Sequence, residues 1–98
     1  MRVRWLRKSL LNLEQEAAYI AQDNPKAAAE FVIHLRDSAL MLGEQPNLGR
    51  PGRIPGTREF GVTHFPYILP YRVRNDTVEI LRVFHTARKW PNSPRRMG

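Results

Sequence analysis

The feature that most constrains the fold is a pair of apolar runs, residues 67–73 and 77–84, separated by the dipeptide Asn75-Asp76. Both runs are rich in Val, Ile, Leu, Tyr and Phe, which suit a pleated, half-buried surface. Asn and Asp tolerate the backbone conformations that a tight turn requires. The pattern predicts a β-hairpin, followed at once by a polar and basic segment from His85 to Trp90.

Two registers of this hairpin are compatible with the sequence. A two-residue turn would pair Tyr71 with Ile80, whereas a three-residue loop would pair Arg72 with Ile80, and a slip of one residue moves every side chain to the other face. We favour the three-residue loop, because it turns four large residues towards the core and places Arg72 and Arg82 together on the opposite face. Pro70 cannot donate a ladder hydrogen bond and therefore indicates an edge strand or a bulge.

Two helices are predicted upstream of the hairpin, because apolar residues recur there at intervals of three and four between residues 10 and 42. Ser9 is the candidate cap of the first helix. Asn24 and Pro25 suit the cap and the first position of the second helix, and Gly43 suits its C-terminal end. A connection this short makes the two helices an antiparallel hairpin.

The remaining segments complete an α+β fold. Residues 1–5 alternate apolar and Arg side chains, which predicts a short strand, and residues 57–62 predict another. Residues 45–56 contain three Pro and three Gly and are expected to form a basic loop. The expected architecture is an N-terminal strand, an antiparallel two-helix hairpin and a three-stranded antiparallel meander, with the helices on one face of one mainly antiparallel sheet. Residues 1–98 are expected to form a single domain with a short basic tail at about 91–98.

The composition narrows the possible partners. Sixteen Lys and Arg residues, most of them Arg, oppose nine Asp and Glu residues, which gives a net charge of +7. Such a chain is attracted to nucleic acid or to an acidic protein. The absence of cysteine excludes disulfides, cysteine-ligated zinc and a cysteine nucleophile. We see neither a signal peptide nor a membrane span and expect a cytoplasmic protein. We also expect neither a cofactor nor a metal site.

The histidines are the candidate catalytic groups. His34, His64 and His85 have no metal-ligand spacing. His85 could act as a general acid or base in RNA cleavage, with Arg82 and Arg88 stabilising the charge on phosphorus. The same side chains could equally bind the acidic surface of a protein partner.

Two segments carry a resemblance to a known family: LPYRVRNDTVEILRVFHTARKWP near the end of the chain and YIAQDNPKAA at the helical turn. Together they resemble the RelE/ParE superfamily of toxins from bacterial type II toxin–antitoxin modules. The resemblance implies a small basic toxin that is neutralised by a cognate antitoxin with an acidic, partly disordered segment. It also implies one of two activities, ribosome-dependent mRNA cleavage in RelE-like members or inhibition of DNA gyrase in ParE-like members.

Departures from the ribonuclease pattern favour the ParE-like branch. RelE-like members carry a catalytic Arg three residues before the Tyr that corresponds to Tyr71, and this chain has Ile68 there. RelE also carries two Lys residues on the preceding strand, whereas residues 58–61 of this chain contain none. RelE carries a Tyr beyond its last strand, and residues 91–94 of this chain contain no Tyr. Only Arg88 aligns with a late catalytic Arg. We therefore expect a gyrase inhibitor, with a RelE-like ribonuclease and a non-toxic antitoxin-binding co-repressor as the alternatives.

Two surfaces are predicted from charge and expected exposure. The expected target-binding residues are Arg50, Arg53, Arg82, His85, Arg88, Lys89 and Trp90. The expected antitoxin-binding residues, assigned to the sheet face away from the helices, are Phe60, Ile68, Arg72, Ile80 and Phe84. No catalytic residue is assigned for a gyrase inhibitor, and the alternative ribonuclease set is His85, Arg82 and Arg88.

Overall fold

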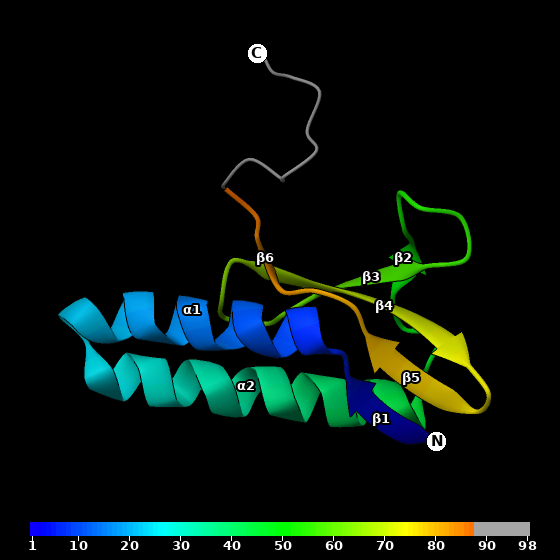
Figure 1. Ribbon diagram of the computed structural model, residues 1–98, viewed down its shortest axis with the longest axis horizontal. Helices are drawn as coiled ribbons and strands as arrows, with labels where there is room; N and C mark the ends of the chain where they lie inside the picture. Colours follow the sequence, from blue (N-terminus) through cyan, green and yellow to red (C-terminus); the bar gives the residue numbers. More distant parts are fainter. Residues whose placement is uncertain (88–98) are drawn as a thin grey trace, which may run out of the picture.

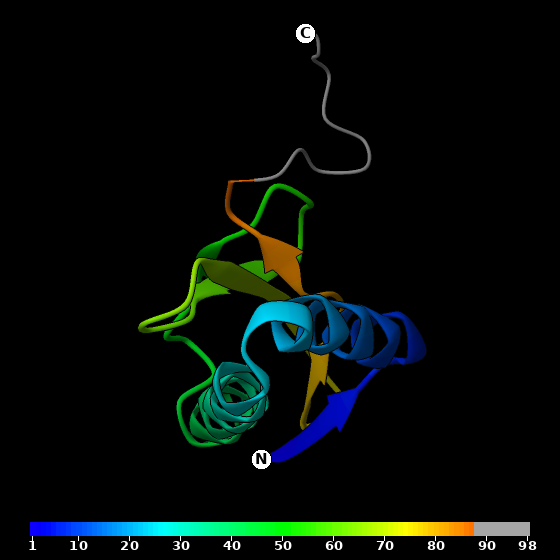
Figure 2. The same cartoon turned by 90° about the vertical axis from the view of Figure 1, so that its left-hand side faces the viewer.

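A computed structural model describes residues 1–87 of the chain (Figure 1). A helical hairpin lies against one face of a single sheet, and both helices lie on the same side of it (Figure 2). In chain order the elements are β1 (Arg2–Trp5), α1 (Arg7–Asp23), α2 (Pro25–Glu44), β2 (Arg50–Pro51), β3 (Arg58–Gly61), β4 (Tyr67–Arg74), β5 (Thr77–Ile80) and β6 (Phe84–His85).

The strands form one mainly antiparallel sheet in the order β1-β5-β4-β3-β2, with β6 pairing the far end of β4. β1 runs parallel to β5, and all the other pairs are antiparallel. The helical hairpin carries the chain from β1 at one edge of the sheet to β2 at the opposite edge, and the antiparallel strands that follow bring β5 back beside β1 in the parallel sense. The predicted α+β architecture is confirmed, and β2 and β6 are short additions to it.

α1 begins earlier than predicted. The helix starts at Arg7 with Leu6 at the cap position, so Ser9 lies within the first turn. The Ser9 hydroxyl donates a hydrogen bond of 2.6 Å to the Leu6 carbonyl oxygen, and the side chain is fully buried. Ser9 is therefore a satisfied buried hydroxyl, and the prediction that it caps the helix was wrong.

α2 begins as predicted and ends later. The Asn24 side chain accepts a hydrogen bond of 3.0 Å from the Ala27 N–H, and Pro25 occupies the first helical position. Gly43, however, lies inside the helix, whose cap is Gln45. A Cβ at Gly43 would lie 2.7 Å from Val3 Cγ2. The glycine at this position therefore lets α2 approach β1, and its assignment as a C-terminal cap was wrong.

The core lies between the helices and the sheet. The apolar residues of the second helix that recur at intervals of three and four are all buried, namely Ala28, Phe31, Leu35, Ala39 and Leu42. The sheet contributes alternate residues of β4 and β5. The fully buried side chains from these elements include Phe31, Leu35, Leu42, Leu69, Tyr71, Val78 and Ile80. Leu13, Ala17 and Ile20 of α1 pack against this cluster.

The favoured register of the hairpin was wrong near the turn. Tyr71 pairs with Ile80 across a two-residue turn, in which Asn75 and Asp76 have φ angles of 52° and 57°. Positive φ at both positions defines a type I′ turn, whose twist matches that of the strands. Arg72 and Arg82 therefore do not lie together, because Arg72 faces Glu79 instead.

The pairing shifts by one residue beyond the hairpin. Tyr71 pairs with Ile80, and Ile68 pairs with Phe84. The partner segment from Ile80 to Phe84 is therefore one residue longer than the segment of β4 that it faces, as in a β-bulge. The Pro70 carbonyl accepts a hydrogen bond from the Leu81 N–H, but proline has no N–H to donate in return. Pro70 lies in an interior strand, so of its two predicted placements the bulge is the one observed.

The turn supports a stability prediction. Replacing Asp76 with glycine should raise the free energy of unfolding by about 0.5–1 kcal/mol, because glycine adopts the left-handed conformation without a Cβ clash. The check is the urea midpoint of the Asp76→Gly variant, with Asp76→Ala as the control that keeps a Cβ. A Gly variant no more stable than the Ala variant would contradict the type I′ assignment.

Candidate functional site: the basic sheet surface

The sheet face opposite the helices carries part of the predicted antitoxin-binding set. Side chains alternate between the two faces along a strand. Because Leu69 and Tyr71 are buried against the helices, Ile68, Pro70 and Arg72 lie on the other face, which we call the open face. Phe84 pairs with Ile68 and lies there too.

The predicted antitoxin-binding set is divided by this arrangement. Ile68, Arg72 and Phe84 lie on the open face, as expected. Ile80 was expected there but is fully buried in the core, because the two-residue turn aligns it with Tyr71. Phe60 was also expected there, but it pairs with Leu69 and packs against the core from the helix side. The prediction that Ile80 and Phe60 lie on the open face was therefore wrong.

Arg82 lies at the boundary between α1 and β6. Its Nε donates a hydrogen bond of 2.9 Å to Asn12 Oδ1, which also accepts the Val83 N–H at 3.1 Å. Its guanidinium carbon lies 4.9 Å from the centroid of the Phe84 ring. Arg82 thus connects the irregular segment after β5 to the first helix.

His85 has a different environment. Its ring lies edge-on to the Tyr67 ring, with the centroids 5.0 Å apart, and its Nδ1 accepts the Ala87 N–H at 3.0 Å. Because His85 pairs with Tyr67, it lies on the helix side of the sheet, whereas Ile68 and Phe84 lie on the open face. Within residues 1–87, no hydrogen bond, ion pair or ring contact joins His85 to Arg82.

The remaining predicted target-binding residues lie in two places. Arg50 lies in the edge strand β2, opposite Glu59 of β3. Arg53 follows in the next loop. Its side-chain Nε lies 3.9 Å from Glu59 Oε2, and its backbone N–H donates a hydrogen bond of 3.2 Å to the same oxygen. The predicted residues Arg88, Lys89 and Trp90 lie outside the described residues.

A buried tyrosine holds the segment that leads into this edge. The Tyr71 hydroxyl donates to the Pro46 carbonyl oxygen at 2.7 Å and accepts the Gly49 N–H at 2.8 Å. A Cβ at Gly49 would lie 2.6 Å from that hydroxyl, so only glycine permits the approach. Burial raises the pKa of the Tyr71 hydroxyl, which stays neutral and can both donate and accept.

Sequence reasoning missed a group of arginines at the other end of the open face. Arg4 and Arg72 both lie near Glu79, with nitrogen–oxygen distances of 4.0 Å and 2.6 Å. The Arg72 hydrogen bond, assisted by the charges of Arg74 and Arg4, lowers the pKa of the Glu79 carboxyl. The signal that could have revealed this group is the repeated triplet Arg-Val-Arg, at residues 2–4 and 72–74.

The other two histidines lie together. The rings of His34 and His64 are edge-on, with the centroids 5.7 Å apart, and His34 also contacts Phe65. In the part of the chain that the structure describes, no three histidine, aspartate or glutamate side chains are grouped as a metal site.

Neither helix is apolar enough over a sufficient length to cross a lipid bilayer.

The fold is shared with solved toxin–antitoxin structures. The chromosomal ParDE system of P. aeruginosa contains a chain that is similar with a TM-score of 0.79 and 25% identity, over 87% of this chain and 95% of that one. The RelBE2 toxin–antitoxin complex of Mycobacterium tuberculosis contains another, with a TM-score of 0.57 and 28% identity, over 86% and 95% of the two chains. The architecture is thus that of a small type II toxin.

Sequence comparisons identify the family. Residues 3–90 match the family described as "ParE toxin of type II toxin-antitoxin system, parDE". The putative toxin Y4kP of Sinorhizobium fredii is 46% identical over 92% of this chain and 93% of its own length. Toxin RelE2 of Caulobacter vibrioides is 34% identical over 86% of this chain and 93% of its own length. The chain belongs to the ParE toxin family of type II toxin–antitoxin systems, within the RelE/ParE superfamily.

The tyrosine anchor gives one prediction. Tyr71→Phe should lower the free energy of unfolding by about 1–3 kcal/mol, because the variant leaves the buried Gly49 N–H and the Pro46 carbonyl without their partner. Urea denaturation measures this decrease, and hydrogen exchange of the Gly49 amide should accelerate. Thr63→Val, which removes a hydroxyl from an exposed position in the segment before β4, is the control. Unchanged protection of Gly49 in Tyr71→Phe would contradict the anchoring role.

Glu79 gives a pH-dependent prediction. Its pKa in the folded chain lies below the ordinary value of 4.5, so its carboxylate stabilises the fold above that pH, and the contribution is lost as the pH falls through the folded pKa. Glu79→Gln should therefore be less stable than the natural chain near neutrality, with the difference closing below about pH 4.5. The measurement is a series of urea titrations at stepped pH, with the exposed Glu30→Gln as the control. A difference that persists unchanged in acid would refute it.

Proposed function

We propose that this toxin inhibits DNA gyrase by protein–protein binding and is neutralised by a cognate antitoxin. The observation that supports this most is the environment of Ile68. RelE-like ribonucleases carry a catalytic Arg at the corresponding position, and here the position holds an aliphatic side chain paired with Phe84 on the open face. An apolar pair cannot stabilise the negative charge that develops on a phosphate during cleavage.

The alternative ribonuclease set is also dispersed. Cleavage of RNA requires a base for the 2′-hydroxyl, a cation for the phosphorus centre and an acid for the leaving group within one site. His85 lies on the helix side beside Tyr67, whereas Arg82 donates its Nε hydrogen to Asn12. These two side chains do not supply such a site in the described part of the chain.

The ribonuclease alternative retains one supporting observation, since a relative that is 34% identical is named Toxin RelE2. A further alternative is a non-toxic chain that binds the antitoxin and assists repression. The two alternatives differ from gyrase inhibition in what they do to mRNA and to growth, so the same pair of assays separates all three.

The proposed antitoxin partner would cover apolar surface. Large apolar side chains are exposed on the outer surfaces of both helices, including Leu10, Leu11, Ile33 and Leu40. Ile33 and Leu40 are seven residues apart and therefore lie on the same side of α2. An acidic segment that folds on binding would bury this surface and complement the net charge of +7.

The test measures both activities on one preparation. In a gyrase assay run with and without ATP, the purified toxin should reduce DNA supercoiling or cause cleaved DNA to accumulate. In a parallel assay with programmed ribosomes, the toxin should leave the mRNA intact. Codon-positioned mRNA cuts with normal supercoiling would overturn the proposal. Neither effect, together with expression that does not arrest growth, would support the co-repressor.

A matched pair of variants tests the proposed gyrase-binding edge. Arg50→Gln combined with Arg53→Gln should weaken inhibition of gyrase by roughly tenfold or more, as expected for charged interface residues. Arg7→Gln combined with Arg36→Gln removes the same charge from exposed positions on the helices and should retain inhibition. An equal weakening in the two variants would assign the effect to net charge and not to this edge.

A further inference from the structure

Two Arg-Val-Arg triplets that are far apart in the sequence flank the same strand. β1 carries the first and β4 the second, and β5 lies between them. The registers align Arg2 and Arg74 with Thr77, and align Arg4 and Arg72 with Glu79. The result is two rows across the sheet, each with an arginine on both sides of β5. We call these four side chains the arginine quartet: Arg2, Arg4, Arg72 and Arg74.

All four members lie on the open face. Val3, between Arg2 and Arg4, packs against the core on the helix side, and Tyr71, next to Arg72, is buried there. Alternation along each strand therefore turns the arginines away from the helices. Arg2, Arg4 and Arg74 line one shallow depression together with Glu79 and Thr77.

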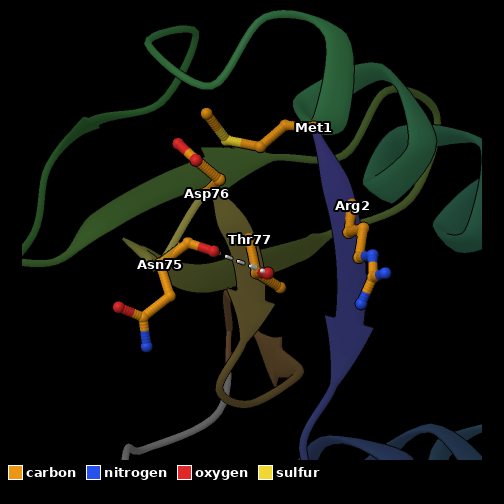
Figure 3. A pocket seen from close by; sticks show the side chains of 5 residues that line it. All are labelled: Met1, Arg2, Asn75, Asp76 and Thr77. Carbon is orange, nitrogen blue, oxygen red and sulfur yellow. Dashed lines mark hydrogen bonds between the residues drawn. The ribbon is translucent and has the colours of Figure 1, made fainter.

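The quartet has an unbalanced positive charge. Three arginines of the quartet and one carboxylate, Glu79, line the depression among the described residues, and Arg72 pairs with the same carboxylate, so the four guanidinium groups and Glu79 together carry a charge of +3. Arg72 and Arg4 share Glu79, whereas neither Arg2 nor Arg74 has a carboxylate within 4.0 Å in residues 1–87. Asp76 lies at the turn nearby and lines, together with Met1 and Arg2, the neighbouring pocket shown in Figure 3, but it forms no ion pair with Arg2 within 4.0 Å in the described residues.

The side chains that line the depression suit phosphate groups better than unpaired bases or an amphipathic peptide helix. Its lining contains no aromatic side chain among the described residues, so it offers no platform on which unpaired bases could stack. Its one apolar residue, Val3, packs against the core, so it offers no anchor for the apolar face of a peptide helix. What it presents is a set of guanidinium groups on a sheet, and guanidinium forks match phosphate oxygens.

From this arrangement we propose that the arginine quartet binds the phosphate backbone of duplex DNA, without reading its sequence. The two arginines of one triplet are at positions i and i+2 of a strand, about 7 Å apart, and β1 and β4, with β5 between them, are about 10 Å apart. The four guanidinium groups can therefore contact several phosphates at once. The proposal does not depend on which target the toxin inhibits, because it concerns the toxin and DNA alone.

The test compares two charge-matched variants of the full chain. Arg2→Gln with Arg74→Gln removes the quartet members that have no ion-pair partner, so Glu79 keeps both of its arginines. Arg7→Gln with Arg36→Gln removes the same charge from exposed positions on the helices. Binding to a short fluorescent DNA duplex is followed by anisotropy at several salt concentrations from about 50 to 200 mM, the range over which phosphate binding changes affinity strongly. Thermal unfolding confirms that both variants fold.

The quartet variant should bind duplex DNA roughly tenfold more weakly, and the slope of log affinity against log salt should fall by about 0.9 for each phosphate that the variant no longer neutralises. The helix-surface variant should keep the slope of the natural chain. Glu79→Gln, which removes the one carboxylate, should strengthen binding. Equal slopes in the quartet and helix-surface variants would overturn the proposal. Stronger quartet-dependent binding to single-stranded RNA or to polyglutamate would also overturn it, and would assign the surface to RNA or to an acidic protein.

Discussion

The register of the β4–β5 hairpin is the constraint on which the rest of the structure depends. Asn75 and Asp76 both adopt positive φ, and the resulting two-residue turn aligns Tyr71 with Ile80. That alignment sends the large side chains of both strands into the core beneath the helices. A slip of one residue would exchange the two faces, burying arginines and exposing the core.

The same register organises the charges on the open face. It places Glu79 between Arg72 of β4 and Arg4 of β1, although these arginines are 68 positions apart in the chain. The ion pairs are partly exposed, so they contribute modestly to stability and chiefly fix the positions of the side chains. The carboxylate keeps two arginines ordered while the face as a whole stays positive.

Tyr71 connects the core to the other end of the open face. Its ring is buried between sheet and helices, and its hydroxyl holds Pro46 and Gly49 at the start of the basic segment that contains Arg50. One side chain therefore stabilises the core and positions the edge strand proposed to contact gyrase. The bulge beyond Leu81 has a comparable effect, because it separates Arg82 from the arginines of the hairpin and brings it to Asn12 of α1.

The sequence by itself determined the α+β class, the stripe of α2, the Asn24 cap and the general position of the hairpin, because these depend on local periodicity and on the chemistry of single residues. It also contained the departure at Ile68. The tertiary structure decided the register, since both alternatives satisfied the local apolar pattern and differed in the number of residues in the turn. It likewise moved Ser9 and Gly43 into helices and Ile80 into the core. Only the parallel pairing of β1 with β5 brought the two Arg-Val-Arg triplets together, because contacts between distant segments are set by packing and not by neighbours in the chain.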